Sequence, residues 1–106
     1  MVEELRPAEL ATRIRAGEDW QLLDVREPWE LGIVSLADAV VIPMNQVPNR
    51  HRELDSERPL AVLCHGGMRS YRVAAWLQEQ GFRRVVNVAG GIDAWATEVD
   101  SSMSRY

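Results

Sequence analysis

The stretch LAVLCHGGMRSYR, residues 60–72, contains the pattern that decides the fold. It begins with an apolar run that does not alternate with polar residues, which is typical of a strand covered on both faces. Two glycines follow, and beyond them Val73, Ala74 and Leu77 have the spacing of the apolar face of a helix that ends at Gly81. The stretch therefore predicts a buried strand, a short loop and a helix in direct succession.

The same alternation of strands and helices extends over the rest of the chain. Strands are expected at 20–26, 38–44, 58–64 and 82–91, and helices at 6–17, 45–54, 70–81 and 91–99, with a short turn or helix after Pro28. Alternating elements of this kind predict an α/β fold, in which a small parallel sheet is flanked by helices on both faces. We expect one domain over residues 1–106, with its core at about 5–96 and a loosely held tail at 97–106.

Composition and charge narrow the classes of protein to consider. Hydrophobic residues make up 46% of the chain and charged residues 26%, as in globular domains, and the formal net charge of −4 argues against a nucleic-acid partner. The single cysteine excludes an internal disulfide, which favours a reducing compartment. No apolar run approaches the roughly 20 residues of a membrane span, and the first residues lack a signal-peptide pattern. We therefore expect a cytoplasmic monomer without a membrane partner.

The single cysteine, Cys64, follows the clearest strand and precedes the clearest helix. In parallel sheets, ligands bind at the carboxyl ends of the strands. Three features favour a thiolate here: the N-terminal end of the helix, the backbone amides that Gly66 and Gly67 allow to converge, and the charge of Arg69. They predict a nucleophile that meets an anionic substrate. Because free cysteines are also among the most buried residues, the residues alone leave open a Cys64 that only packs in the core.

The loop sequence CHGGMRS, residues 64–70, resembles the active-site loop of the rhodanese-like sulfurtransferases. Three other segments resemble the same family in the same order: LLDVREPWEL at 22–31, AVVIPMNQVPNR at 39–50 and GFRRVVNVAGGIDAW at 81–95. The resemblance covers about residues 5–96, and it implies a single rhodanese module with the α/β fold described above.

The resemblance also implies a reaction and its residues. Cys64 would attack the outer sulfur of thiosulfate or a similar small anionic donor, become a persulfide, and pass this sulfur to cyanide or to a thiol, including a thiol on a protein. The loop would bind the donor through its backbone amides, and Arg69 would order the loop and favour anions. The substrate-binding residues implied are His65, Gly66, Gly67, Met68, Arg69 and Ser70. No metal or organic cofactor is implied, because the cysteine carries the sulfur itself.

Two other functions remain open at this point. A non-catalytic rhodanese-like binding or regulatory module would use the same fold, although such modules typically lack the cysteine. A small phosphatase or arsenate reductase would use a related loop, but four residues separate Cys64 from Arg69, one fewer than in the phosphatase loop. The shorter loop favours sulfur over a tetrahedral phosphate. Asp38 lies where the family often has a glycine, and aspartate tolerates a left-handed backbone better than most residues.

Several other polar and aromatic residues have competing interpretations. His65 could be a general base but fits a residue at the rim of the pocket better, and His51 is expected at the surface. Asp24 and Arg26 are interpreted as an ion pair that fixes neighbouring loops, in preference to an acid–base pair. Cys64 and His65 are adjacent and His51 is the only other histidine, so no metal site is expected. The four tryptophans are interpreted as core and rim packing.

Overall fold

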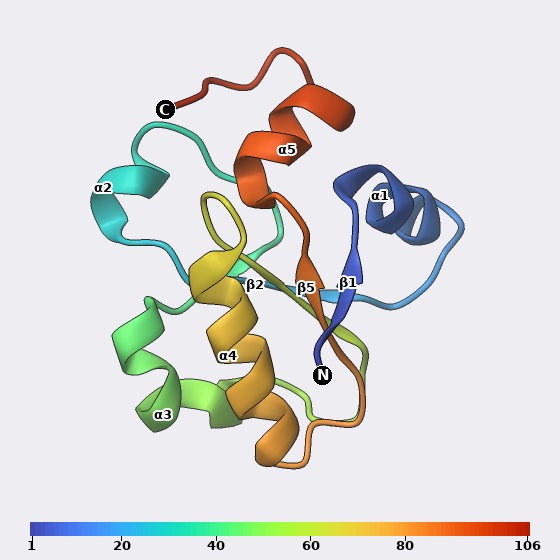
Figure 1. The fold of residues 1–106 in the computed structure, drawn as a ribbon, viewed down its shortest axis with the longest axis vertical. Helices are drawn as coiled ribbons and strands as arrows, with labels where there is room; N and C mark the ends of the chain where they lie inside the picture. The colour runs from blue at the N-terminus through green and yellow to red at the C-terminus, as the bar shows by residue number, and fades with distance from the viewer.

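The computed structural model describes residues 1–106 and has a five-stranded sheet at its centre (Figure 1). All neighbouring strands are parallel, and their order is β1-β5-β4-β2-β3. The strands are β1 (Glu3–Leu5), β2 (Gln21–Asp24), β3 (Val40–Val41), β4 (Leu60–Leu63) and β5 (Val85–Val88). The predicted parallel sheet is therefore confirmed. Strand β1 was not predicted; it is three residues long and begins with two glutamates.

Helices cover both faces of the sheet, as predicted. They are α1 (Pro7–Arg15), α2 (Pro28–Leu31), α3 (Val47–Arg50), α4 (Met68–Glu79) and α5 (Gly91–Glu98). Helices α1 and α5 lie on one side of the sheet and α3 and α4 on the other (Figure 1). The helix expected at 45–54 is divided into α3 and two flanking 3-10 turns, Met44–Gln46 and His51–Glu53. None of the helices has the length and apolar composition that a membrane span requires.

Strand β4 is buried along its whole length, which explains its unbroken apolar sequence. Leu60 and Val62 pack in the cluster beneath α3 and α4, whereas Ala61 and Leu63 pack in the cluster beneath α1 and α5. Because side chains alternate along a strand, the next residue on the α4 side is Cys64, which lies in the first cluster. The sheet thus delivers Cys64 to its carboxyl edge, at the start of α4.

Helix α4 has the inner face that the sequence predicted, since Val73, Ala74 and Leu77 are all buried against the sheet. The interpretation of Asp38 is also confirmed, because its backbone has φ = 66° in the left-handed region. Among the tryptophans, Trp20 and Trp95 are core residues, whereas the side chain of Trp29 is 66% exposed.

The C-terminal segment differs from the prediction of a loosely held tail. Met103 packs against the cluster beneath α1 and α5, and Arg105 forms an ion pair with Asp93 at 2.9 Å. The ring of Tyr106 stacks on the ring of His65 with 4.0 Å between their centroids. The reason is that tyrosine offers a large apolar ring with a polar tip, and both find partners here. The segment therefore contacts the loop that contains Cys64.

His51 is a second, smaller difference. It was expected at the surface, but its ring is half-buried and meets the ring of Trp76 edge-on, with 5.1 Å between the centroids. Its Nδ1 lies 3.1 Å from the carbonyl oxygen of Pro48. The residue therefore packs against α4.

Candidate active site

The loop after β4 is held on its outer side by the first turn of α5. The N–H of Ile92 donates to the carbonyl of Cys64 (2.8 Å), and the N–H of Asp93 donates to the carbonyl of His65 (3.1 Å). In a trans peptide the N–H points opposite to the carbonyl, so these two peptides direct their own N–H groups away from α5. Gly91 permits the close approach, because a Cβ there would lie 2.3 Å from the carbonyl oxygen of His65.

The backbone N–H groups of residues 65–70 form a series of donors at the edge of the sheet. Only the N–H of Gly67 has a partner within the chain, the sulfur of Cys64 at 3.1 Å. Gly67 has φ = 107° and precedes the first turn of α4, whose amides also have no partner. Free amides at a helix N-terminus favour an anion, so the loop can bind a small anionic group.

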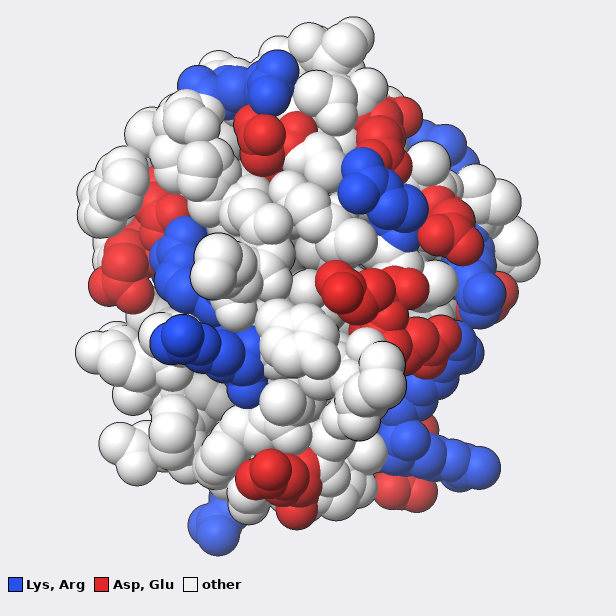
Figure 2. Space-filling view, viewed as in Figure 1, with Lys and Arg blue, Asp and Glu red and all other residues white.

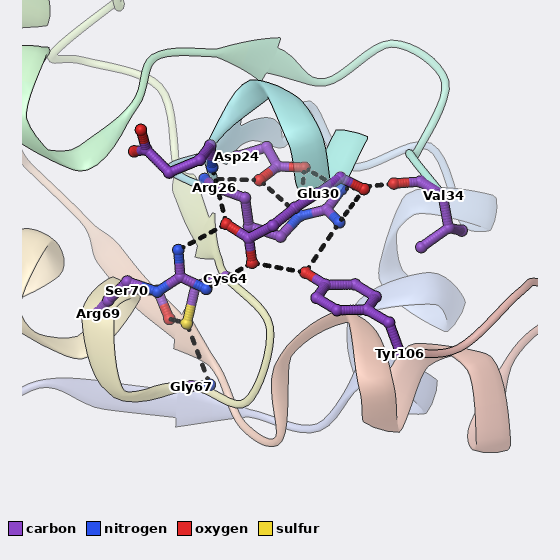
Figure 3. Close-up of polar contacts among 10 residues, drawn as sticks. Asp24, Arg26, Glu30, Val34, Cys64, Gly67, Arg69, Ser70 and Tyr106 are labelled. Atoms are coloured by element: carbon purple, nitrogen blue, oxygen red, sulfur yellow. Dashed lines mark hydrogen bonds and ion pairs between the residues drawn. The ribbon is translucent and has the colours of Figure 1, made fainter. Parts of the chain in front are cut away.

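The sulfur of Cys64 lies inside the loop, and the residue is only 1% exposed. Its second polar neighbour is the hydroxyl of Ser70, with the Oγ at 3.2 Å (Figure 3). Ser70 is fully buried, and its Oγ also lies 2.5 Å from the Oδ1 of Asn87 on β5. Asn87 was not among the site residues predicted from the sequence. The signal that could have identified it is a lone polar residue within the apolar strand VVNV.

Arg69 is held by Glu30, a second residue that was not predicted from the sequence. Its two terminal nitrogens donate to the two carboxylate oxygens of Glu30 on α2, each at 2.8 Å (Figure 3). Glu30 is 2% exposed and also accepts hydrogen bonds from the N–H of Glu27 and the hydroxyl of Tyr106. The Arg69 hydrogen bonds lower the pKa of Glu30 to about 2, against the opposing effect of burial. The charge of Arg69 is therefore balanced by a carboxylate.

Asp24 and Arg26 form the ion pair that the sequence predicted, at 2.7 Å and with both side chains buried. Burial acts to lower the pKa of Arg26, but the hydrogen bonds with Asp24 and Tyr106 outweigh it and raise this pKa. Arg26 also donates to the carbonyl of Val34 at 2.9 Å. The pair therefore fixes the segment after α2 and the C-terminal segment around Glu30, which confirms its interpretation as a structural pair.

The other residues proposed for the loop have different surroundings. The ring of His65 stacks on Tyr106, and its Nε2 is shielded from solvent without a hydrogen-bond partner, so it forms no hydrogen bond with the Cys64 sulfur. This placement agrees with a residue at the rim and gives no support to a general base. Gly66 is exposed, and Met68 is 78% exposed at the end of the loop.

A depression of about 380 Å³ lies beside the loop. It is lined by Gly66, Gly67, Met68 and Asn87, and by the charged side chains of Glu4 and Arg72. Arg72 has no carboxylate partner, unlike Arg69. On the face shown in Figure 2, acidic and basic groups are interspersed. The loop thus has an unpaired cation at its rim and free amides along its backbone.

Comparison with known proteins agrees with this arrangement. The family model described as "Rhodanese-like domain" matches residues 6–98. A curated protein of Allochromatium vinosum named "Sulfurtransferase" is 40% identical over 96 residues, which cover 91% of this chain and 90% of that protein. "Thiosulfate sulfurtransferase GlpE" of Pseudomonas syringae is 37% identical over 76 residues, or 72% of each chain. A rhodanese-related protein from Thermoplasma volcanium has a similar crystal structure, with a TM-score of 0.82, 33% identity and coverage of 92% and 93% of the two chains.

Proposed function

The chain belongs to the rhodanese-like domain family, and we propose that it is a sulfurtransferase whose Cys64 carries the transferred sulfur as a persulfide. The curated relative named sulfurtransferase, which the chain matches over 90% of its length, supports sulfur transfer in general. The observation that carries the assignment to Cys64 is its sulfur within a loop of free N–H donors, one of which donates to it at 3.1 Å. Fixed N–H donors of this kind can hold the charge of an anionic donor and of the persulfide beside the sulfur.

Thiosulfate, or another small anion with a terminal sulfur, is the proposed donor. Two features support it: the free amides of the loop, which suit an anionic group, and the unpaired Arg72 at the rim. The similarity to a relative named thiosulfate sulfurtransferase points the same way. The substrate contacts proposed are the backbone N–H groups from His65 to Ser70, with Arg69 ordering the loop through Glu30.

The proposed reaction has two displacement steps on sulfur. The Cys64 thiolate attacks the terminal sulfur of thiosulfate, the sulfur–sulfur bond of the donor breaks, and its electron pair leaves with sulfite. An acceptor such as cyanide or a thiolate then attacks the outer sulfur of the persulfide, and the electron pair of the broken bond returns to Cys64. This is covalent catalysis by an activated nucleophile, and the electrons balance without any further reactant.

A second candidate function rests on a specific observation, the 1% exposure of Cys64. In that case the chain would be a binding module in which the thiol packs and does not react. The two functions are separated by incubating the protein with thiosulfate and measuring the mass of the intact protein and of its Cys64 peptide. We expect the mass of one added sulfur atom on Cys64, and its release by cyanide as thiocyanate. Cys64→Ser is the control, and a folded wild-type protein that takes up no sulfur would support the binding module.

A further inference from the structure

A chain of hydrogen bonds leads from the Cys64 sulfur across two neighbouring strands. The Oγ of Ser70 lies 3.2 Å from this sulfur and 2.5 Å from the Oδ1 of Asn87. The Nδ2 of Asn87 donates to the carbonyl of Gly67 at 3.0 Å and to the carboxylate of Glu4 at 2.9 Å. Asn87 and Glu4 are register partners on β5 and β1. The network thus joins the sulfur to the edge of the sheet.

The orientation of the Asn87 amide is fixed by this network. Both hydrogens of its Nδ2 are used by oxygen atoms that can only accept, the Gly67 carbonyl and the Glu4 carboxylate. A flipped amide would place its Oδ1 against these two acceptors. The Oδ1 therefore faces Ser70, and because Asn87 is 1% exposed, solvent does not supply another donor.

The hydroxyl of Ser70 has one proton and two neighbours that can accept it. When Cys64 is a thiol, its S–H donates to the Ser70 oxygen, and the hydroxyl donates to Asn87. When Cys64 is a thiolate, its sulfur gains most from a second donor besides the N–H of Gly67, and the only one in reach is the same hydroxyl. The Oδ1 of Asn87 then loses its donor while buried, which is costly.

From this geometry we propose that Asn87 is a positioning residue that competes with the Cys64 sulfur for the single proton of the Ser70 hydroxyl. The proposal deepens the function proposed above: the competition itself concerns only the thiol, and its effect on sulfur transfer rests on that function. Asn87 disfavours the free thiolate, because the thiolate forms its bond to Ser70 at the expense of the Ser70–Asn87 bond. The hydroxyl therefore donates to Asn87 when the sulfur is neutral and to the sulfur when it is a thiolate.

This competition has a consequence for the proposed sulfur-transfer cycle. Once the outer sulfur is attached, the Sγ of Cys64 carries neither a proton nor a charge, and the hydroxyl returns to Asn87. When an acceptor removes the outer sulfur, the electron pair of the broken bond leaves Sγ as a thiolate, which needs the hydroxyl again. Asn87 thus favours the sulfur-loaded protein over the free thiolate and slows the loss of sulfur to poor acceptors.

Other charged or titratable groups lie around the Cys64 loop on the surrounding elements. They are Arg69 and Arg72 on α4, Glu30 on α2, His65 in the loop, Asp93 on α5, Glu4 beyond Asn87 on β1, the Asp24–Arg26 pair at the end of β2, and Tyr106 in the C-terminal segment. Ser70→Ala leaves all these side chains and their partners unchanged. Asn87→Leu also removes its donors to Glu4 and to the Gly67 carbonyl, so the double variant and a Glu4 variant are needed to isolate the effect of the hydroxyl.

The experiment measures the rate of alkylation by iodoacetamide against pH, which follows the single thiol of the chain. Ser70→Ala removes the donor to the thiolate and should raise the midpoint by roughly one pH unit. Asn87→Leu removes the competing acceptor at similar size and should lower the midpoint by a comparable amount. In the double variant, Asn87→Leu should add no change to that of Ser70→Ala, because no hydroxyl remains to be shared.

Two further variants complete the test. Glu4→Gln keeps an oxygen acceptor for Asn87 but removes a negative charge that lies beyond Asn87, so its midpoint should fall by much less than that of Asn87→Leu. Asn87→Ala removes the same acceptor and serves if circular dichroism shows that the leucine variant is unfolded. Three results would each overturn the proposal. They are a folded Asn87 variant that keeps or raises the midpoint, an Asn87 variant that lowers it equally in the absence of the Ser70 hydroxyl, and a Glu4→Gln variant that lowers it as much as Asn87→Leu does. Because alkylation needs no sulfur donor, these results stand whether or not the chain transfers sulfur.

Discussion

The carboxylate of Glu30 and the guanidinium of Arg69 face each other through two parallel hydrogen bonds of 2.8 Å, which join α2 to the first turn of α4. The loop before Arg69 is therefore held from two directions. Helix α5 holds its carbonyls, through the N–H groups of Ile92 and Asp93, and α2 holds its last side chain. A cradle of backbone amides needs this support, because its donors act on an anion only when they are fixed in place.

Glu30→Gln tests the support from α2. The change replaces the carboxylate that pairs with the Arg69 guanidinium by a neutral, buried amide. We therefore expect the free energy of unfolding to fall by roughly 2–3 kcal/mol at neutral pH. Sulfur transfer should fall as well, because Arg69 no longer fixes the loop. The matched control is Glu53→Gln, whose pair with Arg50 lies at the surface and should contribute little. Urea unfolding measures both, and equal losses in the two variants would contradict a special role for Glu30.

The same pair predicts how stability depends on pH. The pKa of Glu30 falls from its ordinary value of 4.5 to about 2 in the folded protein, chiefly through its hydrogen bonds with Arg69. A carboxylate with a lowered pKa stabilises the fold above the unfolded pKa, and this contribution is lost as the pH falls toward the folded pKa. It amounts to roughly 3 kcal/mol. The loss should occur between about pH 4.5 and 2.

The measurement is urea unfolding of the wild-type protein and of Glu30→Gln at a series of pH values. Other carboxylates, including Glu3, Asp93 and Glu98, also have lowered pKa values, so the difference between the two proteins is the relevant quantity. The advantage of the wild-type protein should shrink steadily as the solution becomes more acidic. A difference that stays constant down to about pH 2 would show that the charge of Glu30 does not carry the effect.

The fold could be predicted from the sequence because its signals are local. The apolar run of β4, the glycines after it and the inner face of α4 lie within one short stretch, and each signal depends on neighbouring residues only. Strand β1 could not be found in this way. It is three residues long with two exposed glutamates, and it exists because β5 offers it a parallel edge.

The site could be predicted only in part, for the same reason. The position of Cys64 after a strand and before a helix is a local pattern. The partners of the loop are not local: Glu30 precedes Arg69 by 39 positions, and Tyr106 lies 76 positions beyond Glu30. Charge and aromaticity alone do not indicate such pairings. The expectation of a loosely held tail was wrong because the ring of Tyr106 stacks on His65 and its hydroxyl donates to the carboxylate of Glu30.

Tyr106 offers a second test of the loop's support. Its pKa is raised, mainly by burial, so the hydroxyl is protonated at neutral pH and donates to Glu30. Tyr106→Phe keeps the stack on His65 and removes the hydroxyl, and it should lower the free energy of unfolding by roughly 1 kcal/mol. Tyr106→Ala removes both and should cost more, because the ring contact with His65 is lost as well. Tyr71→Phe is the control, since its hydroxyl has no partner, and a cost equal to that of Tyr106→Phe would argue against the hydrogen bond.

Gly91→Ala tests the contact between α5 and the Cys64 loop. Gly91 has φ = 62°, and a Cβ there would lie 2.3 Å from the carbonyl oxygen of His65 and 2.5 Å from that of Cys64. Gly17 has φ = 94° but open space around it, so Gly17→Ala measures the backbone strain alone.

We expect Gly17→Ala to cost about 1–2 kcal/mol of stability and Gly91→Ala about 2–5 kcal/mol, because the second change adds overpacking to the strain. The two variants should also differ in chemistry. Displacing the Cys64 and His65 carbonyls turns the peptide planes whose N–H groups belong to the loop, so Gly91→Ala should lose sulfur transfer and Gly17→Ala should keep it. Thermal unfolding and thiocyanate formation measure the two effects. If both variants lost stability equally and Gly91→Ala kept full activity, α5 would not be what holds the loop.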